Sequence, residues 1–234
     1  MSELNDAVAL VTGSSSGIGA AIAAAIAELG ASVVVNSASS VAEGRQVAAE
    51  LPDAIYVQAD VADSASAKRL VAAAVERYGR LDIVVNNAGT TAVIPHDDLD
   101  GATTDIWEKI LRVNVVGTWN VIQAAVPHLR AAGDGIILNI TSLAGVRPVG
   151  SSIPYAVSKA AVNHMTALLA NALGPEIRVN AVAPGLIDTP WTADWDAIRD
   201  TVRETAPLRR SGTPKDVADA CVGLIGTHYA TGQV

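Results

Sequence analysis

Short apolar runs rich in β-branched residues alternate with longer alanine-rich stretches along this chain. Six of these runs are apolar nearly throughout, as expected of strands that are buried on both faces. They predict strands over Ala7–Thr12, Ser32–Asn36, Ala54–Ala59, Leu81–Asn86, Ile136–Thr141 and Ile177–Ala183. The stretches between them predict helices over Gly17–Leu29, Val41–Leu51, Ser64–Tyr78, Thr104–Ala131, Ser152–Leu173 and Pro214–Thr227.

This alternation predicts a parallel sheet with helices on both faces, a doubly wound α/β fold. No linker or change of composition interrupts the pattern, so we expect residues 1–234 to form one domain. One stretch, Pro184–Pro214, lacks strand character and predicts a lid, because long loops in compact domains are usually functional. Its Trp191 and Trp195 either exclude water from a reaction site or anchor the lid or a subunit contact.

Composition and charge exclude several classes of function. The net charge of −8 argues against nucleic acid, which requires an excess of Lys and Arg on one face. The single cysteine, Cys221, excludes a disulfide framework, and the histidines lack metal-ligand spacing, so we expect no metal. No apolar run reaches the roughly 18 residues of a membrane span. No signal-peptide pattern opens the chain, and we predict a cytoplasmic protein that does not bind membranes.

A glycine-rich turn joins the first expected strand to the first expected helix. It reads Thr12-Gly13-Ser14-Ser15-Ser16-Gly17-Ile18-Gly19, one residue longer between glycines than the usual dinucleotide fingerprint. Glycines let the backbone approach a ligand closely, and a helix N-terminus offers free N–H groups and a positive dipole end to a pyrophosphate. The turn therefore predicts a dinucleotide site.

The end of the second strand is where NAD and NADP are distinguished. An acidic residue there would bind the ribose 2′-hydroxyl and repel a 2′-phosphate, but the segment Val33–Ser40 contains no acid, Arg or Lys. The hydroxyls that could hold a 2′-phosphate are those of Ser14, Ser37, Ser39 and Ser40. NADP(H) is therefore favoured and NAD(H) stays possible, while these serines could instead cap the following helix.

Further motifs follow in order along the whole chain. They are Asp60-Val61, Asn86-Asn87-Ala88-Gly89, Asn114, Ser142, Tyr155-x-x-x-Lys159 and Pro184-Gly185. With them the chain resembles the short-chain dehydrogenase/reductase family, and its general look is similar to 3-oxoacyl-carrier-protein reductases. The resemblance implies a Rossmann-type sheet and a homodimer or homotetramer. It also implies a seventh strand after Thr231-Gly232-Gln233, so we expect six strands and an open sheet edge in the sequence up to Val234.

The catalytic constellation centres on Tyr155 and Lys159, which share one helix face because they are four residues apart. An ordinary Tyr pKa of about 10 is too high for a base at neutral pH, and a neighbouring ammonium would lower it. Tyr155 would then exchange a proton with the substrate oxygen, and Ser142, just past the fifth strand, would orient the carbonyl. By resemblance, Asn114 holds a water that connects Lys159 to solvent, and Lys159 holds the nicotinamide ribose.

The cofactor contacts follow from the same resemblance. Asp60 is expected at the adenine, and Ile187 and Thr189 at the nicotinamide carboxamide. The full set is Gly13, Ser14, Ser16, Gly17, Ile18, Gly19, Ser37, Asp60, Val61, Asn87, Ala88, Gly89, Tyr155, Lys159, Pro184, Gly185, Ile187 and Thr189.

Together these residues predict an NADP(H)-dependent oxidoreductase that moves a hydride between the nicotinamide and a carbonyl/alcohol pair. By resemblance, carrier-protein reductases meet their acidic partner with basic residues where Gly135 and Pro175 stand here. A free small-molecule ketone or alcohol is therefore favoured over a carrier-bound thioester. The alternatives are an NAD(H)-dependent alcohol, polyol or hydroxysteroid dehydrogenase, and a non-catalytic cofactor-sensing relative. The presence of Tyr155 and Lys159 disfavours the last.

Overall fold

The computed structural model describes residues 4–234, and its centre is a parallel sheet of six strands in the order β3-β2-β1-β4-β5-β6. The strands are β1 (Val8–Val11), β2 (Ser32–Ser37), β3 (Ala54–Gln58), β4 (Ile83–Asn86), β5 (Gly135–Ile140) and β6 (Ile177–Val182). Each strand begins and ends close to its predicted range. The apolar runs form the buried centre of the sheet except at β3, which lies at the sheet edge and is only partly buried. The prediction of a doubly wound, Rossmann-type α/β fold is confirmed.

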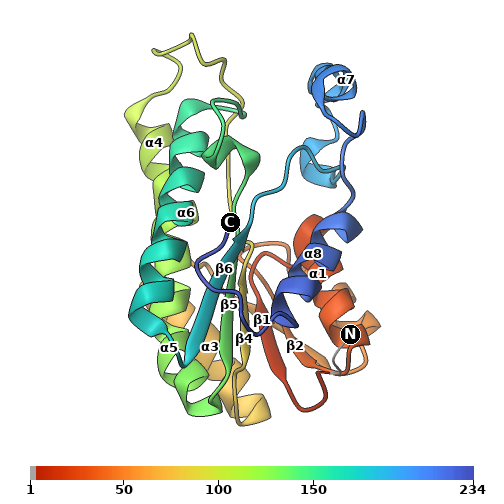
Figure 1. Cartoon of the computed structure of the whole chain (residues 1–234), viewed down its shortest axis with the longest axis vertical. Coiled ribbons are helices and arrows are strands. Elements are labelled where there is room, and N and C mark those ends of the chain that lie inside the picture. Colours follow the sequence, from red (N-terminus) through yellow and green to blue (C-terminus); the bar gives the residue numbers. More distant parts are fainter. Residues whose placement is uncertain (1–3) are drawn as a thin grey trace.

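Helices cover both faces of the sheet (Figure 1). In β1, Val8 and Leu10 belong to one core and Ala9 and Val11 to the other, since successive side chains of a strand point to opposite faces. The first core lies under α3 (Ser64–Tyr78), α5 (Thr118–Ala132) and α6 (Ile153–Leu173). The second lies under α1 (Gly17–Glu28), α2 (Val41–Glu50) and α8 (Pro214–Ile225).

One predicted helix is interrupted. The range Thr104–Ala131 was expected to be continuous, but the structure has α4 (Thr104–Leu111), a π-helical turn over Arg112–Gly117 and then α5. The π turn leaves the helical direction intact and adds one residue to the local turn. Short π segments occur frequently at functional sites, and this one contains the candidate residue Asn114.

The predicted lid contains a helix that the sequence analysis did not anticipate. Between Pro184 and Pro214 the chain forms a 3-10 turn over Pro190–Thr192 and then α7 (Asp196–Thr205). A parallel bridge between Ile187 and Gly212 closes the base of this excursion. None of the residues of α7 is fully buried, and the helix stands above the carboxyl ends of the strands at the upper right of Figure 1.

The outer edge of β6 is less open than we expected. The Gly232 N–H donates to the Val179 carbonyl at 2.7 Å, and the Ala181 N–H donates to the Gln233 carbonyl at 2.8 Å. The segment of Gly232 and Gln233 thus runs beside β6, near the C label of Figure 1. It satisfies backbone groups that an unpaired sheet edge would expose. Among residues 4–234, no helix is long and apolar enough to cross a membrane.

Candidate active site

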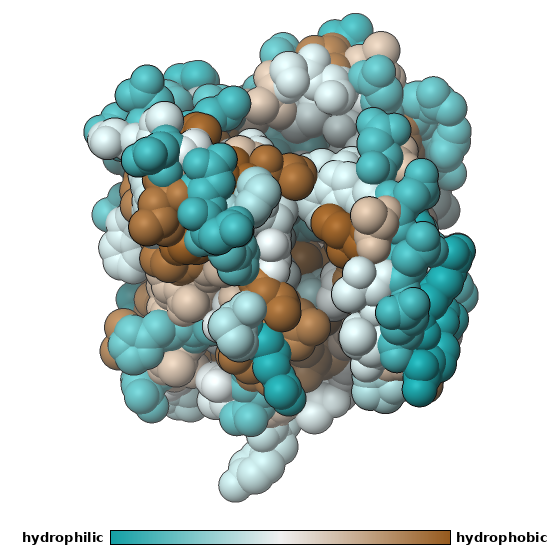
Figure 2. All heavy atoms as spheres, turned by 90° about the horizontal axis from the view of Figure 1, so that it is seen from above, coloured by the Kyte–Doolittle hydropathy of each residue, from teal (hydrophilic) through white to brown (hydrophobic). Residues whose placement is uncertain are grey.

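A cavity of about 390 Å³ opens at the carboxyl ends of the strands. Its lining comes from five regions: the glycine turn, the segment after β4, the end of β5 with the loop that follows, the first turns of α6, and the lid. Figure 2 looks down on this end of the molecule and shows a hollow with apolar side chains on its rim. Open α/β sheets bind their ligands in this place, because strand order reverses there between β1 and β4.

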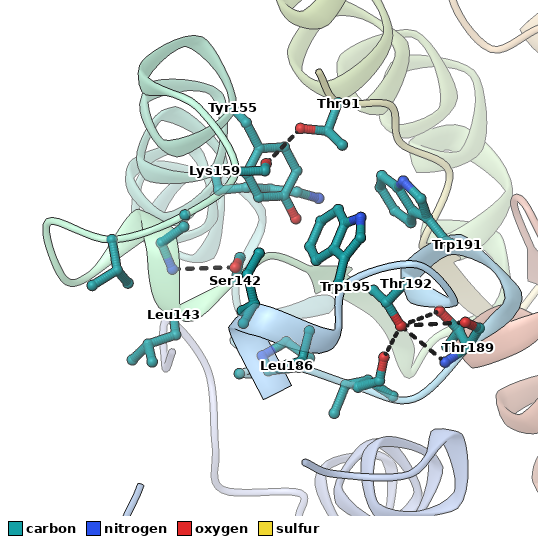
Figure 3. Close-up of a pocket in the computed structure, with 18 of the residues that line it drawn as sticks. Thr91, Ser142, Leu143, Tyr155, Lys159, Leu186, Thr189, Trp191, Thr192 and Trp195 are labelled. Carbon is teal, nitrogen blue, oxygen red and sulfur yellow. Dashed lines mark hydrogen bonds between the residues drawn. The ribbon is translucent and has the colours of Figure 1, made fainter. Parts of the chain in front are cut away.

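Ser142, Tyr155 and Lys159 meet in this cavity (Figure 3). Ser142 directly follows β5 and accepts a hydrogen bond from the Ala144 N–H at 3.1 Å. Its hydroxyl is also hydrogen-bonded to the Tyr155 phenol. The Lys159 Nζ lies 5.7 Å from the centroid of the Tyr155 ring, on the same side of α6, and donates to the Ile140 carbonyl at 2.9 Å. The spacing of four residues therefore produces the shared face that was predicted.

The buried setting of these groups changes their acidity. Burial raises the pKa of the Tyr155 phenol, and the hydrogen bond from Ser142 lowers it by a smaller amount. The expectation that the Lys159 ammonium brings this pKa below its ordinary value is therefore wrong for this structure, because burial outweighs it. The phenol is therefore protonated at neutral pH and is suited to donate a proton. Burial also lowers the pKa of the Lys159 ammonium to about 8. The Lys159 ammonium is therefore charged at neutral pH, and its burial lowers the stability of the fold.

Asn114 lies in the π turn and is almost fully buried. Its amide oxygen accepts from the Thr90 N–H at 2.8 Å, and its amide nitrogen donates to the Thr90 carbonyl at 3.0 Å and to Ser158 at 2.9 Å. These contacts tie the chain after β4 to α6 beside Lys159. A Cβ placed on Gly89 would lie 3.4 Å from the Asn114 amide oxygen and 3.7 Å from the Lys159 Nζ.

The glycine turn is fixed by Thr12 and Asn87. The Thr12 hydroxyl accepts from the N–H groups of Asn87 and Ala88, and the Asn87 amide donates to the carbonyls of Thr12 and Gly13 at 3.0 and 2.9 Å. Gly13 has a φ of 62°, and a Cβ there would come within 2.8 Å of the Ala88 Cα. The turn therefore needs glycine at this position, and the predicted residues Asn87 and Ala88 hold it from the neighbouring strand.

The residues present fit a dinucleotide. Ser16 stands at the N-cap of α1 but makes no capping hydrogen bond, and the first turn of α1 has no acidic residue. The N–H groups of Gly17, Ile18 and Gly19 therefore face an uncapped helix end, which suits a pyrophosphate. A Cβ on Gly17 would lie 3.3 Å from the Thr189 side chain, so the turn and the lid approach each other at this point.

One predicted residue of this turn has its hydroxyl hydrogen-bonded inside the fold. The Ser14 hydroxyl is fully buried, donates to the Val11 carbonyl at 2.6 Å and accepts from the Asn36 N–H at 2.9 Å. It cannot face a 2′-phosphate because it is part of the packing between β1 and β2. The Ser37 hydroxyl is also buried, bonded to Tyr56 and to the Ser40 carbonyl at 2.8 and 3.0 Å.

The remaining predicted cofactor residues lie around the same crevice. Asp60 is exposed after β3 and accepts from the Ala62 N–H, while Val61 is buried and its carbonyl accepts from Asn120. The Leu143 N–H donates to the Pro184 carbonyl at 2.8 Å, which places the segment from Pro184 beside the loop of Ser142. The cavity lining also includes Pro184, Gly185, Ile187 and Thr189.

From the sequence we expect the pocket to be built from Thr90–Pro95, Leu143–Pro154 and Ile187–Thr205, and the cavity lining includes residues from all three segments. Thr91 and Ser151 share a hydrogen bond of 2.6 Å at the edge of the cavity, and Ile198 and Val202 of α7 face into it. The sequence named the segments but not these individual residues.

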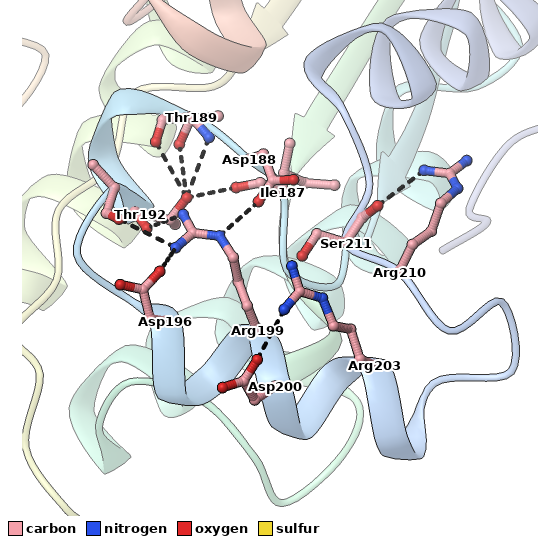
Figure 4. A network of polar contacts seen from close by, with 11 residues as sticks. Ile187, Asp188, Thr189, Thr192, Asp196, Arg199, Asp200, Arg203, Arg210 and Ser211 are labelled. Carbon is pink, nitrogen blue, oxygen red and sulfur yellow. Dashed lines mark hydrogen bonds and ion pairs between the residues drawn. The ribbon is translucent and has the colours of Figure 1, made fainter.

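The lid is held closed at its base by Arg199 (Figure 4). The guanidinium contacts Asp188 at 3.0 Å and Asp196 at 2.9 Å, and it donates to the carbonyls of Thr192 and Ala193. The Thr192 hydroxyl donates to the Ile187 carbonyl at 2.7 Å from within the same segment. Arg199 thereby joins α7 to the turn that carries the lid's aromatic side chains.

We expect Arg199→Met to raise KM for the carbonyl substrate about 3- to 10-fold with a smaller change in kcat, because charge-assisted hydrogen bonds that hold the lid are lost. Steady-state kinetics at several substrate concentrations measures this. Arg203→Met is the matched control, since within residues 4–234 Arg203 forms its ion pair only with Asp200 of its own helix. Equal KM values for the two variants would contradict the role given to Arg199.

Comparisons with known proteins agree with this geometry. A family model described as enoyl-(acyl carrier protein) reductase matches residues 13–234. A protein of Streptomyces violaceoruber named as ketoacyl reductase 2 of the granaticin polyketide synthase is 58% identical over 230 residues, covering 97% of this chain and 92% of the relative. The 3-oxoacyl-[acyl-carrier-protein] reductase FabG of Thermotoga maritima is 38% identical, covering 99% of this chain and 96% of the relative.

A solved structure also resembles this chain closely. The crystal structure of a short-chain dehydrogenase/reductase from Burkholderia xenovorans superposes with a TM-score of 0.91 at 37% identity, covering 97% of this chain and 94% of the other. The chain therefore belongs to the short-chain dehydrogenase/reductase family and is an oxidoreductase that acts on a carbonyl/alcohol pair.

Proposed function

We propose that this chain is an NADP(H)-dependent ketoreductase in which Tyr155 is the proton donor. The observation that carries the proposal is the meeting of Ser142, Tyr155 and Lys159 in the cavity next to an uncapped glycine-turn helix. The raised pKa of Tyr155 supports the reductive direction, because a neutral phenol gives up its proton when a carbonyl oxygen gains charge.

Reduction of the carbonyl needs one hydride and one proton. The nicotinamide, when bound, supplies the hydride for the carbonyl carbon. Tyr155 holds the proton at its phenol oxygen and transfers it to the carbonyl oxygen, so that the carbonyl becomes an alcohol. The Ser142 hydroxyl, bonded to Tyr155, orients that oxygen. The Lys159 ammonium stabilises the phenolate left behind and holds the ribose hydroxyls.

Asn114 completes the proposed proton path. Its side chain is committed to Thr90 and Ser158, so it fixes the backbone next to Lys159. Under this proposal a water beside Asn114 connects the Lys159 ammonium to solvent. The proton that Tyr155 transfers is then replaced through Lys159 and that water.

The preference for NADP(H) rests on the end of β2. No side chain from Ser37 to Ser40 carries a negative charge, and Ala38, Ser39 and Ser40 are exposed. Exposed hydroxyls and N–H groups there can hold a 2′-phosphate, whereas the buried Ser14 cannot. Steady-state rates with NADPH and NADH over a panel of ketones test the assignment, and a strong preference for NADH would contradict it.

Introducing a negative charge at position 39 gives a sharper test. We expect Ser39→Asp to raise KM for NADPH about 10-fold and to leave KM for NADH nearly unchanged, since a carboxylate near a phosphate costs about 1 kcal/mol or more. Ser39→Asn has the same shape without the charge and is the control. If Ser39→Asp weakens both cofactors equally, the 2′-phosphate does not lie at this segment.

The substrate we propose is a free ketone, not one attached to an acidic carrier. Gly135 is buried, and a Cβ there would come within 2.9 Å of Leu129, so no basic side chain fits at that position. Exposed Asp134 and Glu176 flank Gly135 and Pro175 and would repel an acidic partner. The similarity to a ketoacyl reductase of a polyketide synthase supports a ketone of polyketide type.

A homodimer or homotetramer is also part of the proposal. Large apolar side chains are exposed on the outer faces of α5, α6 and the π turn, at Val116, Trp119, Val157 and Leu168. Such a face supports contact with a second copy of the chain, since in a monomer its apolar side chains would stay exposed to water.

A further inference from the structure

Two tryptophans of the lid face the catalytic tyrosine. Trp191 and Trp195 both line the cavity, and Figure 3 shows their indoles directed from the lid toward Tyr155. The rings of Trp191 and Tyr155 are edge to face, with centroids 6.5 Å apart and planes at 87°. Trp191 is still 50% exposed, so much of its ring remains available to a ligand. This arrangement favours a direct role in the site over the anchoring role considered from the sequence.

The cavity is almost without charge. Among the described residues that line it, Lys159 is the only charged one, and its ammonium is buried against the Ile140 carbonyl. A carboxylate or phosphate on the substrate would find no cation there besides the Lys159 ammonium, which already donates to a backbone carbonyl, and an amine would find no carboxylate. Since an unpaired buried charge is costly, the lining selects a neutral substrate.

The wall formed by α7 is apolar as well. Four residues on one face of α7 line the cavity: Ile198, Thr201, Val202 and Thr205. The hydroxyls of Thr201 and Thr205 donate to carbonyls one turn earlier, at 3.0 and 2.7 Å, and so offer no hydrogen to a ligand. None of the α7 residues is fully buried, which leaves an apolar stripe exposed on the cavity side. Such a stripe gains stability when an apolar body covers it.

The backbone that carries the two indoles is held by hydrogen bonds within the lid. The 3-10 turn that carries Trp191 is fixed by the Thr192 hydroxyl, which donates to the Ile187 carbonyl and accepts from the Thr189 N–H. Arg199 holds the carbonyls of Thr192 and Ala193 between the two tryptophans. A backbone fixed in this way reduces the conformational entropy that the segment loses when a ligand binds.

We infer that this site selects a neutral ketone whose body beyond the carbonyl is a planar aromatic ring system, recognised by Trp191 and Trp195. The inference rests on the proposed ketoreductase function and names its substrate class. Aromatic rings attract one another in edge-to-face and offset arrangements at centroid distances of about 4.5–7 Å, the range in which Trp191 already meets Tyr155. A saturated ring or an acyclic chain of equal size would fill the same space without that contribution.

The test compares three ketones of ten carbons, 2-tetralone, 2-decalone and 2-decanone, which are aromatic, saturated bicyclic and acyclic. We expect kcat/KM to fall in that order. Trp191→Leu and Trp195→Leu should each lower the ratio of kcat/KM for 2-tetralone to that for 2-decalone about 3- to 10-fold, and the corresponding Phe variants should retain most of it. Trp107→Leu, in α4 and outside the cavity lining, is the control and should keep the parental ratio.

The outcomes separate the inference from the function on which it rests. If the parent reduces all three ketones and the Leu variants keep its ratio, the aromatic recognition is overturned and the ketoreductase function stands. If the parent reduces none of them with either NADPH or NADH, the proposed function is overturned and the inference with it. Thermal unfolding of each variant shows that a changed ratio does not come from an unfolded lid.

Discussion

Tyr155→Phe will lower kcat for ketone reduction about 10²- to 10⁴-fold, the contribution typical of a positioned general acid. The substitution removes only the phenol oxygen, which is bonded to Ser142 inside the cavity. Because burial raises the pKa of Tyr155, the lost group is a protonated donor at neutral pH. NADPH consumption under saturating ketone measures the effect, and NADPH binding followed by fluorescence should stay within about threefold of the parent.

A second tyrosine is the control for the loss of a phenol hydroxyl outside the cavity. The Tyr78 hydroxyl donates to Asp53 and Tyr78 does not line the cavity as described, so Tyr78→Phe should keep the parental kcat. If Tyr155→Phe turns over every substrate at the parental rate, Tyr155 is not the proton donor, and the non-catalytic, cofactor-sensing alternative gains support.

Lys159→Met should lower kcat at least about 100-fold and at the same time stabilise the fold. Burial lowers the pKa of Lys159 to about 8 from an ordinary 10.5, so the charged ammonium is less stable in the folded chain than in the unfolded one. Removing it should increase the free energy of unfolding at neutral pH by about 1–3 kcal/mol, allowing for the hydrogen bond to Ile140 that is lost.

The sign of the pH dependence follows from linkage. Below a pH of about 8 both states hold the proton, and the folded parent bears the full cost. As the pH rises from about 8 toward 10.5, the folded state releases the proton while the unfolded state keeps it, so the parent gains stability and the advantage of Lys159→Met shrinks. Denaturant unfolding over this range measures it, with exposed Lys68→Met as control. A variant less stable than the parent at neutral pH would contradict the account.

The strands could be predicted closely because a parallel sheet buried on both faces leaves continuous apolar runs in the sequence. The π turn over Arg112–Gly117 could not be predicted, because its Val, Asn and Gly residues weaken helix propensity without specifying a π-helical turn. Helix α7 was missed because it is short, polar and flanked by prolines, and its apolar residues face a cavity instead of a core.

For the site, the sequence predicted which residues come together but not the contacts that orient them. Ser142, Tyr155 and Lys159 converge because strand ends and the first turn of a following helix meet at one edge of a parallel sheet. The burial of Ser14 depends on how β1 packs against β2, and the direction of Trp191 and Trp195 depends on the Arg199 contacts. Such tertiary contacts leave no periodic signal in the sequence.

The central claim, hydride transfer from the nicotinamide to a ketone with Tyr155 as proton donor, is tested most directly with NADPH carrying deuterium at the transferable position of the nicotinamide. The alcohol formed from 2-tetralone by the parent protein should carry one deuterium on its carbinol carbon, as read by mass spectrometry. Tyr155→Phe should form almost none of this alcohol while binding NADPH normally. An unlabelled alcohol, or equal labelled product from the parent and Tyr155→Phe, would contradict the account.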